Sequence, residues 1–361
     1  MRPAGAAVGT GAGAGSAAGG SGADGGDPAG GNPAGGNPAG GDEPHPVSAA
    51  TRTAVAIHRT RTVVIVQRSR RRGFATCAHT VSSQLAPGAL TVSTMTVASD
   101  KVATFRALHV PGRPLLMPNP WDAGTAKLLA SLGFAALATT SSGYAATLGR
   151  LDGAISRDEA LAHAASIVTA VDIPVSADLE NGFADDPGTV AATVTEASVV
   201  GLAGCSIEDF SGESIYDLSL AAERVAAAVN ASRSRLVLTA RAENHIRGNP
   251  DLADTIKRLQ AYQEAGADVL YAPGLNTASD IRSVIASVDR PVNVLTVRGL
   301  PPVAELAELG VARISVGGAF SQVALAALIR AGQELQQAGT YGFLDLAIEG
   351  RQQAAATFTA L

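Results

Sequence analysis

The stretch VSADLENGF, residues 175–183, decides the fold together with a later stretch, IED, residues 207–209. Each is a short apolar run that ends on carboxylates and is followed by a turn and a helical pattern. An apolar strand that stops on acidic residues places them at the carboxyl-terminal edge of a parallel sheet, where α/β enzymes carry their catalytic groups. The alternative is that these acids only cap the helices that follow. Two such strand ends within one helical repeat, with Arg241 after a further strand, favour a catalytic edge.

Strand and helix patterns alternate eight times from about residue 112 onward. Most strand candidates are continuous apolar runs, as expected for parallel strands buried on both faces. Strands are predicted at residues 114–117, 136–140, 173–178, 204–208, 235–240, 269–272, 291–294 and 312–316, and helices at residues 123–132, 157–171, 189–200, 220–231, 252–265, 278–288, 303–309 and 320–338. We therefore predict an α/β protein with a (β/α)8 TIM barrel. An open doubly wound sheet is the alternative, and it is disfavoured because no Gly-x-Gly-x-x-Gly follows the first strand.

Residues 1–94 differ in composition from the rest of the 361-residue chain. They hold a Gly/Ala/Pro tract in which a five-residue unit recurs at Asp27, Asn32 and Asn37, followed by an Arg-rich run at residues 68–72. Such a segment has too little side-chain surface to offset its chain entropy, so we predict a disordered N-terminal tail. Met95 opens the barrel-like sequence, so residues 95–361 are predicted to form the catalytic domain, and Met95 is a candidate true start.

Charge and cysteine content narrow the classes of partner and the compartment. Residues 1–94 carry 8 Lys/Arg against 4 Asp/Glu, and because the whole chain has a net charge of −5, the remaining residues are acidic at −9. An acidic body argues against nucleic acid as the partner, and no apolar run is long enough to span a bilayer. Two cysteines, Cys77 and Cys205, make no disulfide framework, which predicts a reducing cytoplasm. The acid-poor stretch 47–93 keeps an organelle-targeting segment as the alternative.

Residues that directly follow the predicted strands meet in one ring if the barrel forms. Asp178, Glu180 and Glu208 supply the hard oxygen ligands that Mg²⁺ prefers. Arg241 and the turn at residues 141–143 can hold an anion through guanidinium and backbone N–H groups. The set predicts a small di- or tri-anionic oxo acid chelated to Mg²⁺, with the metal polarising a carbonyl and stabilising an enolate as an adjacent bond breaks.

Five short motifs resemble, in order and spacing, the isocitrate lyase/phosphoenolpyruvate mutase superfamily over about residues 100–340. They are TSSG at 140–143, GRLD at 149–152, ADLENGF at 177–183, IED at 207–209 and ARAE at 240–243. The resemblance implies a TIM barrel enzyme that uses Mg²⁺ and acts on a small carboxylate or phosphonate.

The resemblance also implies roles for particular residues of this chain. It implies that Asp178 binds Mg²⁺ directly, and that Glu180 and Glu208 hold the ion directly or through water. It implies that the amides of Ser142 and Gly143 bind the substrate and that Asp152 lies beside it. It also implies that Arg241 binds the substrate. Asn293, in the seventh predicted strand, either orients substrate or satisfies backbone groups.

The segment after the fourth predicted strand departs from the superfamily pattern. Isocitrate and methylisocitrate lyases carry Lys-Lys-Cys-Gly-His there, whereas this chain reads FSGESIYD at residues 210–217, with neither Cys nor His. The phosphonate branch places an asparagine in that loop, and none is present here. The first hypothesis is therefore a Mg²⁺-dependent lyase of a 2-oxo or 2-hydroxy carboxylate, by C–C cleavage or decarboxylation. P–C chemistry on a phosphonate (a mutase, that is an isomerase, or a hydrolase) is the alternative, and a non-catalytic barrel scaffold is the third.

The last predicted helix, residues 320–338, has a broad apolar face that the barrel does not need for its own core. The resemblance implies that this helix packs on, or is exchanged with, a neighbouring barrel. We therefore predict a homodimer or homotetramer. Two histidines are also considered: His163, in a helix, is expected to be structural, and His245 lies close enough to the predicted edge for a role.

Overall fold

The computed structural model describes residues 100–232 and 235–359, and within them the eight predicted strands form one parallel sheet. The sheet order is β1-β8-β7-β6-β5-β4-β3-β2, which is sequential around a barrel. The strands are β1 (Leu115–Met117), β2 (Leu137–Ala138), β3 (Val175–Asp178), β4 (Gly204–Glu208), β5 (Val237–Arg241), β6 (Val269–Tyr271), β7 (Val292–Leu295) and β8 (Arg313–Ser315). The predicted barrel is confirmed, with strands one or more residues shorter than predicted in most cases.

The seam between β1 and β2 is nearly closed. These two short strands form no ladder in the described residues, but Ala138 N donates to Pro118 O at 3.1 Å just beyond β1. Asn119 Nδ2 donates to Thr139 O at 2.9 Å in the same place. The predicted catalytic edge therefore runs around the full ring of strand ends.

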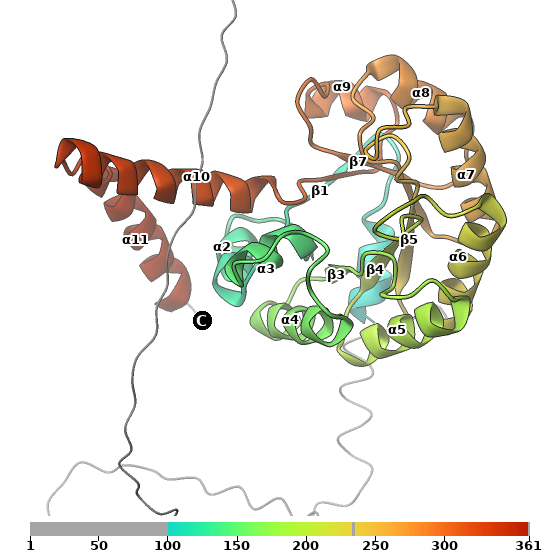
Figure 1. Cartoon of the computed structure of the whole chain (residues 1–361), viewed down its shortest axis with the longest axis horizontal. Coiled ribbons are helices and arrows are strands. Elements are labelled where there is room, and N and C mark those ends of the chain that lie inside the picture. Colours follow the sequence, from blue (N-terminus) through green and yellow to red (C-terminus); the bar gives the residue numbers. More distant parts are fainter. Residues whose placement is uncertain (1–99, 233–234, 360–361) are drawn as a thin grey trace, which may run out of the picture. The chain divides into compact units, whose positions relative to one another are not determined.

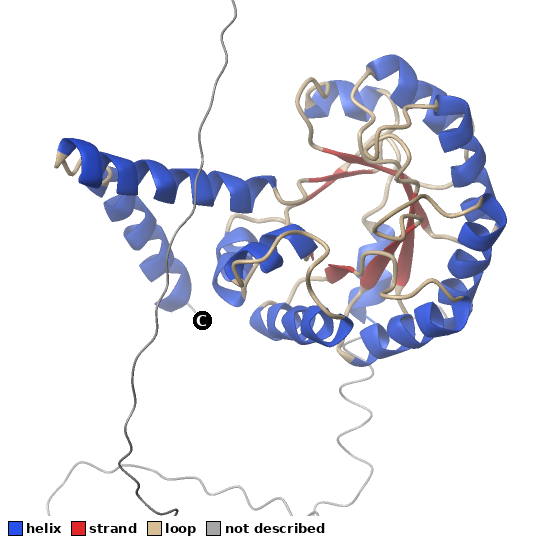
Figure 2. Cartoon of the chain, in the orientation of Figure 1, coloured by secondary structure: helices blue, strands red, loops and turns tan. Residues whose placement is uncertain are grey.

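Helices surround the strands, as Figure 2 shows in blue around red. They are α2 (Ala123–Ser131), α4 (Arg157–Ala170), α5 (Pro187–Val199), α6 (Leu218–Ser232), α7 (Leu252–Glu264), α8 (Ala278–Ala286), α9 (Val303–Glu308) and α10 (Ala319–Gln333). Their starts follow the expected chemistry: Ser156, Asp186 and Asp251 each cap the backbone N–H groups of the helix they precede. The eight predicted helices are confirmed.

One expected turn is a helix instead. Residues 141–143 were predicted as a backbone turn, but they begin the short helix α3 (Ser141–Thr147). Thr140 caps this helix, since its Oγ1 accepts a hydrogen bond from Gly143 N at 3.3 Å. A threonine followed by small residues suits a helix start as well as a turn, and the cap decides between them.

The core has an outer layer between strands and helices and a smaller cluster at the amino-terminal end of the barrel. Phe105, from the helical residues 100–107, is fully buried in that second cluster. Gly204 allows this packing, because a Cβ there would lie 2.6 Å from Phe105 Cε1 and 2.8 Å from Val237 O. Cys205 is buried in the outer layer as a free thiol.

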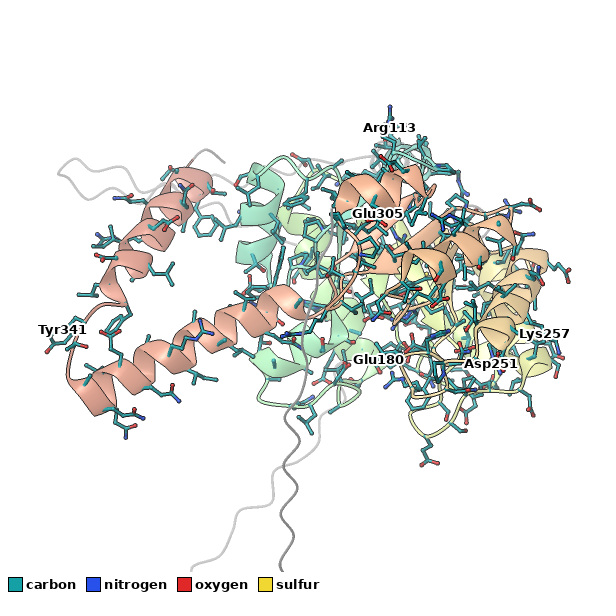
Figure 3. All side chains as sticks on the ribbon, turned by 90° about the horizontal axis from the view of Figure 1, so that it is seen from above. Arg113, Glu180, Asp251, Lys257, Glu305 and Tyr341 are labelled. Atoms are coloured by element: carbon teal, nitrogen blue, oxygen red, sulfur yellow. The ribbon has the colours of Figure 1, made fainter. Side chains whose placement is uncertain are left out.

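A helical arm follows the barrel (Figure 1). Helix α10 continues through a π-helical turn (Glu334–Ala338), and a further helix, α11 (Leu344–Thr359), which was not predicted, returns to contact α2. Tyr341 marks the far end of the arm in Figure 3. The arm exposes apolar side chains along both helices: Val323, Leu325, Leu328, Ile329, Leu335, Leu344, Leu346, Ile348 and Phe358. An exposed apolar surface of this kind is typical of an interface.

The oligomer prediction can be tested on this arm. We expect the chain to be a dimer or tetramer, and the double substitution Leu328→Asp with Ile329→Asp to give a smaller species, because charge on the apolar face opposes its burial. Light scattering on a sizing column at micromolar concentration measures the mass. Val199→Asp, at a comparably exposed apolar residue on α5, is the control and should leave the mass unchanged. A monomeric wild-type chain would contradict the prediction.

The predictions for residues 1–94 and for the start at Met95 lie outside the described residues. Among the helices of the described ranges, none is both long and apolar enough to cross a membrane.

Candidate active site

A cavity of about 990 Å³ opens at the carboxyl-terminal ends of the strands. Almost all residues predicted for the site line it: Ser142, Asp152, Asp178, Glu180, Glu208, Arg241 and Asn293. Gly143 is the exception, since it is buried and its N–H is donated to Thr140 Oγ1. A Cβ at Gly143 would lie 2.5 Å from Thr140 Cγ2, so close packing explains the glycine. The structure therefore gives the Gly143 amide a capping contact rather than a place in the cavity.

Arg241, at the end of β5, forms ion pairs with three carboxylates. Its Nη1 lies 2.9 Å from Asp178 Oδ1, and its Nη2 lies 3.1 Å from Glu208 Oε2 and 2.8 Å from Glu243 Oε1. Burial lowers the pKa of the guanidinium, but the three acids outweigh burial and raise that pKa well above its usual value. Arg241 is thus a permanent cation at the centre of the site.

Asp178 ends β3 and is held by helix α3 from the other side. Ser141 Oγ lies 3.0 Å from Asp178 Oδ2 and 2.9 Å from Asp152 Oδ1, within hydrogen-bond reach of both acids. Ser141 N adds a longer contact of 3.4 Å to Asp178 Oδ2. Ser141 therefore links the predicted metal-binding acid with the predicted catalytic acid.

Glu180 has an unusual environment for a carboxylate. Its backbone has a φ of 48°, in the left-handed region that non-glycine residues seldom adopt. Its Oε1 is buried without a hydrogen-bond partner. Burial, followed by the charges of Asp178 and Asp152, raises the pKa of Glu180 to about 7. Strained backbone and an unsatisfied buried oxygen are typical of functional sites.

Glu208 and Glu243 form the inner acidic pair. Burial raises the pKa of Glu208, and Glu243 and Asp178 raise it further against the opposing effect of Arg241. Arg247 lies between the two acids, with Nη2 3.6 Å from Glu208 Oε1 and Nε 3.3 Å from Glu243 Oε2. Glu243 is the last residue of the ARAE motif, whereas the sequence analysis gave Arg247 no role.

Asp209 supports this pair from behind the sheet. Its Oδ1 accepts a hydrogen bond from Glu243 N at 2.8 Å, and its Oδ2 accepts one from Arg258 Nη1 at 3.2 Å and a short one, 2.5 Å, from the Tyr262 hydroxyl. Arg258 and Tyr262 both belong to helix α7, so Asp209 fixes the end of β4 against the helix layer. The second acid of the IED motif is therefore a positioning residue rather than a cavity ligand.

The side of the cavity formed by β7 and β8 carries a buried polar network of which the sequence analysis named only Asn293. Asn293 Nδ2 donates to Ser315 Oγ at 3.0 Å, and Asn293 Oδ1 accepts from Arg313 Nε at 3.0 Å. Arg313 also lines the cavity. The signal was an arginine inside the otherwise apolar strand 312–316, a residue type that is seldom buried without a partner.

The segment at 210–217 lies over one side of the cavity. Phe210 and Ile215 pair as an isolated antiparallel bridge, and Arg247 stacks on the Phe210 ring at 3.9 Å. Neither of the two histidines considered from the sequence lines the cavity. His163 is structural as expected, since it stacks on Tyr144 and hydrogen-bonds Trp121 O through Nε2. His245 has a buried Nε2 without a partner.

The predicted Mg²⁺ ligands fit a hard divalent cation by their chemistry. In residues 100–232 and 235–359 no three His, Cys, Asp or Glu side chains are grouped closely enough to hold a metal ion as they stand, and Asp178 and Glu208 each pair with Arg241. Even so, Asp178, Glu180 and Glu208 line one cavity, and Glu180 Oε1 needs a partner. Crowded carboxylates are the groups that a cation stabilises, and burial raises the pKa values of Glu180 and Glu208.

The raised pKa of Glu180 predicts how stability depends on pH. A carboxyl whose pKa rises from 4.5 to about 7 on folding binds a proton more tightly in the folded state. Its contribution to stability is therefore complete below about pH 4.5 and is lost as the pH rises through about 7. In metal-free buffer with EDTA, we expect the melting temperature of wild type to fall more steeply between pH 5 and pH 8 than that of Glu180→Gln. Parallel melting profiles would show that Glu180 does not titrate in this range.

Comparison with known proteins places the chain in a family. The family model for phosphoenolpyruvate phosphomutase matches residues 105–336. An uncharacterized protein of Mycobacterium tuberculosis is 33% identical over 248 residues, covering 67% of this chain and 94% of that protein. A crystal structure from Burkholderia cenocepacia, described as a lyase/mutase, is 51% identical with a TM-score of 0.69, covering 71% of this chain and 96% of the other.

A characterised enzyme is among the similar structures. The crystal structure of 2,3-dimethylmalate lyase, a member of the PEP mutase/isocitrate lyase superfamily, is 29% identical with a TM-score of 0.61, covering 67% of this chain and 89% of that chain. The family match spans the whole cavity, and the resemblance seen in the five motifs is confirmed. This chain belongs to the phosphoenolpyruvate phosphomutase family and is an enzyme of the isocitrate lyase/PEP mutase superfamily.

Proposed function

We propose that this protein is a Mg²⁺-dependent lyase that cleaves a C–C bond in, or decarboxylates, a small 2-oxo or 2-hydroxy carboxylate. The observation that carries the proposal is the grouping of Asp178, Glu180 and Glu208 with Arg241 around one cavity at the strand ends. The 29% identity to 2,3-dimethylmalate lyase, an enzyme named for a lyase reaction on a dicarboxylate, supports the same class.

Asp178, Glu180 and Glu208 would hold the ion, which supplies Lewis-acid polarisation of the substrate carbonyl when bound. Ser141 keeps Asp178 oriented and ties it to Asp152, which faces the substrate space. Arg241 pairs with Asp178 and Glu208 and offers positive charge to an anionic substrate. Ser142 and Asn293 line the same space with polar groups that can orient the substrate.

The proton that the carbanionic product needs cannot come from a thiol or imidazole of residues 210–217, because that segment contains neither Cys nor His. The chain therefore differs at this step from relatives that use a loop cysteine. This favours substrates other than isocitrate or methylisocitrate.

A thermal-shift experiment tests the proposal. We expect Mg²⁺ and oxalate, a planar mimic of a 2-oxo acid enolate, to raise the melting temperature together more than either does alone. At a ligand concentration of 100 Kd the gain corresponds to about 2.7 kcal/mol. NMR on the wild-type enzyme with Mg²⁺ and a panel of 2-oxo and 2-hydroxy acids then identifies a cleaved substrate. Absence of any joint effect would contradict the metal-dependent lyase.

Phosphonate chemistry is the second candidate, because the matching family model is that of a phosphomutase. Turnover of phosphonopyruvate, seen by ³¹P NMR as phosphoenolpyruvate or inorganic phosphate, would favour it over C–C cleavage. A catalytically inactive scaffold would show neither turnover nor joint stabilisation by Mg²⁺ and oxalate.

A further inference from the structure

Arg313 is a buried cation on the wall of the cavity, inward of the catalytic edge. Its side chain comes from β8 and only about 2% of the residue is exposed. Its Nε donates to Asn293 Oδ1 at 3.0 Å, and its Nη2 donates to Thr239 Oγ1 at 3.1 Å. Its Nη1 lies 3.1 Å from His109 Nε2. Arg313 lines the cavity, so it faces the space that a substrate would occupy.

All three of these partners are uncharged. Asn293 and Thr239 are neutral, and His109 is neutral because burial, with the charge of Arg313, lowers its pKa to about 3. His109 Nδ1 lies 2.8 Å from Phe105 O and takes the role of donor, which leaves Nε2 to accept from Arg313. The contacts therefore orient the guanidinium without neutralising it.

The other arginines that line the cavity are each paired with an acid. Arg157 pairs with Asp158 and Glu196, Arg241 with three carboxylates, and Arg247 with Glu208 and Glu243. Arg313, by contrast, has no carboxylate within salt-bridge distance anywhere in the described part of the chain. A buried cation is costly unless it is paired with an anion. No acid of the described chain fills that place, so a bound anion is the natural partner.

The strand register shows how far Arg313 lies from the edge. Arg313 precedes Ser315 by two residues, and its partner Thr239 precedes Arg241 by two residues on β5. Two residues along a strand span about 6.6 Å. The guanidinium of Arg313 thus contacts residues that lie two strand positions deeper in the barrel than Arg241. A short molecule with two anionic ends can reach both arginines.

We propose that Arg313 forms an anion subsite deep in the cavity that receives the second carboxylate of a dicarboxylate substrate. This inference rests on the proposed function, because it assumes that the first carboxylate or oxo group binds at the edge near Asp178 and Arg241. Asn293 is then a positioning residue that aims Arg313, and the preferred substrate class is a short 2-oxo or 2-hydroxy dicarboxylate.

Two matched ligands and two matched variants test the subsite. Malate and its 4-methyl ester have the same hydroxy-acid end and similar length, but only malate carries a second charge. Isothermal titration with Mg²⁺ present measures both dissociation constants. In wild type we expect malate to bind at least about tenfold more tightly than the ester, since a buried charge pair of this kind is worth a tenfold factor or more.

Arg313→Met and Arg313→Lys separate charge from packing, because both lose the guanidinium fork but only the first loses the charge. We expect the malate-to-ester ratio to fall to about one in Arg313→Met and to be partly kept in Arg313→Lys. Equal binding of the two ligands by wild type would overturn the subsite even if neither variant folds. A ratio that survives in Arg313→Met would overturn it as well.

The same titrations distinguish this inference from the proposed function. If malate is preferred over the ester in wild type but binding does not depend on Mg²⁺, the deep subsite stands and the metal-dependent lyase fails. If Mg²⁺ and oxalate stabilise the protein together but malate has no advantage over its ester, the lyase stands and the subsite fails. Failure of malate to bind with or without Mg²⁺ overturns the subsite.

Discussion

Asp178→Ala is expected to abolish turnover and the joint stabilisation by Mg²⁺ and oxalate while leaving the barrel folded. The side chain ends β3 at the cavity and fills no apolar core, so its removal leaves no cavity in the packing. Loss of a metal-binding carboxylate should lower the catalytic rate at least about a thousandfold, which corresponds to about 4 kcal/mol of transition-state stabilisation. The metal-free variant should be as stable as wild type or slightly more stable, because one of several crowded carboxylates is gone.

The measurement is thermal shift with and without Mg²⁺ and oxalate, together with turnover of the best substrate. Glu208→Gln, which keeps the shape and removes the charge, should give an intermediate loss. Glu223→Ala, on the exposed face of α6, is the matched control and should behave as wild type. Equal Mg²⁺-dependent shifts in wild type, Asp178→Ala and Glu208→Gln would mean that these acids do not bind the metal ion.

Arg241→Met is expected to destabilise the protein by about 3–5 kcal/mol, which is a large share of the stability of a typical domain. The substitution leaves Asp178, Glu208 and Glu243 together with Arg247, which is half exposed, as the remaining nearby cation. Removing one ion from a buried cluster of ion pairs lowers stability by more than the whole cluster adds to it, because the other charges stay buried and unpaired. Urea unfolding in EDTA measures the loss.

Mg²⁺ should restore part of this stability, and more in Arg241→Met than in wild type, since a divalent cation can take the place of the missing charge among the acids. Arg282→Met, at an exposed arginine on α8, is the control and should change stability by no more than about 0.5 kcal/mol. If Arg241→Met were as stable as its control, the ion pairs of Arg241 at 2.8–3.1 Å would make no contribution to the stability of the fold.

The local sequence was enough to predict the barrel and the ring of edge residues. Eight apolar runs with helices between them leave few topologies, because parallel strands need helical crossovers of one hand. The position of Asp178, Glu208 and Arg241 at strand ends followed from where the apolar runs stop. The predicted start of α4 at Arg157 is confirmed, and Ser156 caps it through contacts that act within one turn of helix.

Long-range contacts could not be predicted in this way. The sequence pattern did not show that Arg241 pairs with acids of β3, β4 and its own strand end, or that Gly143 turns its amide to Thr140. It did not indicate α11, whose contact with α2 joins residues more than 200 positions apart.

The sequence by itself determined the eightfold repeat and the residue types on the catalytic edge, because hydrophobic period and helix caps are local properties of the chain. Only the tertiary structure decided which charges neutralise one another and which stay free. Arg241 and Arg313 both belong to barrel strands, yet three carboxylates surround the first and only neutral groups contact the second. Electrostatic pairing depends on distances between side chains from different strands, and the closed barrel alone sets those distances.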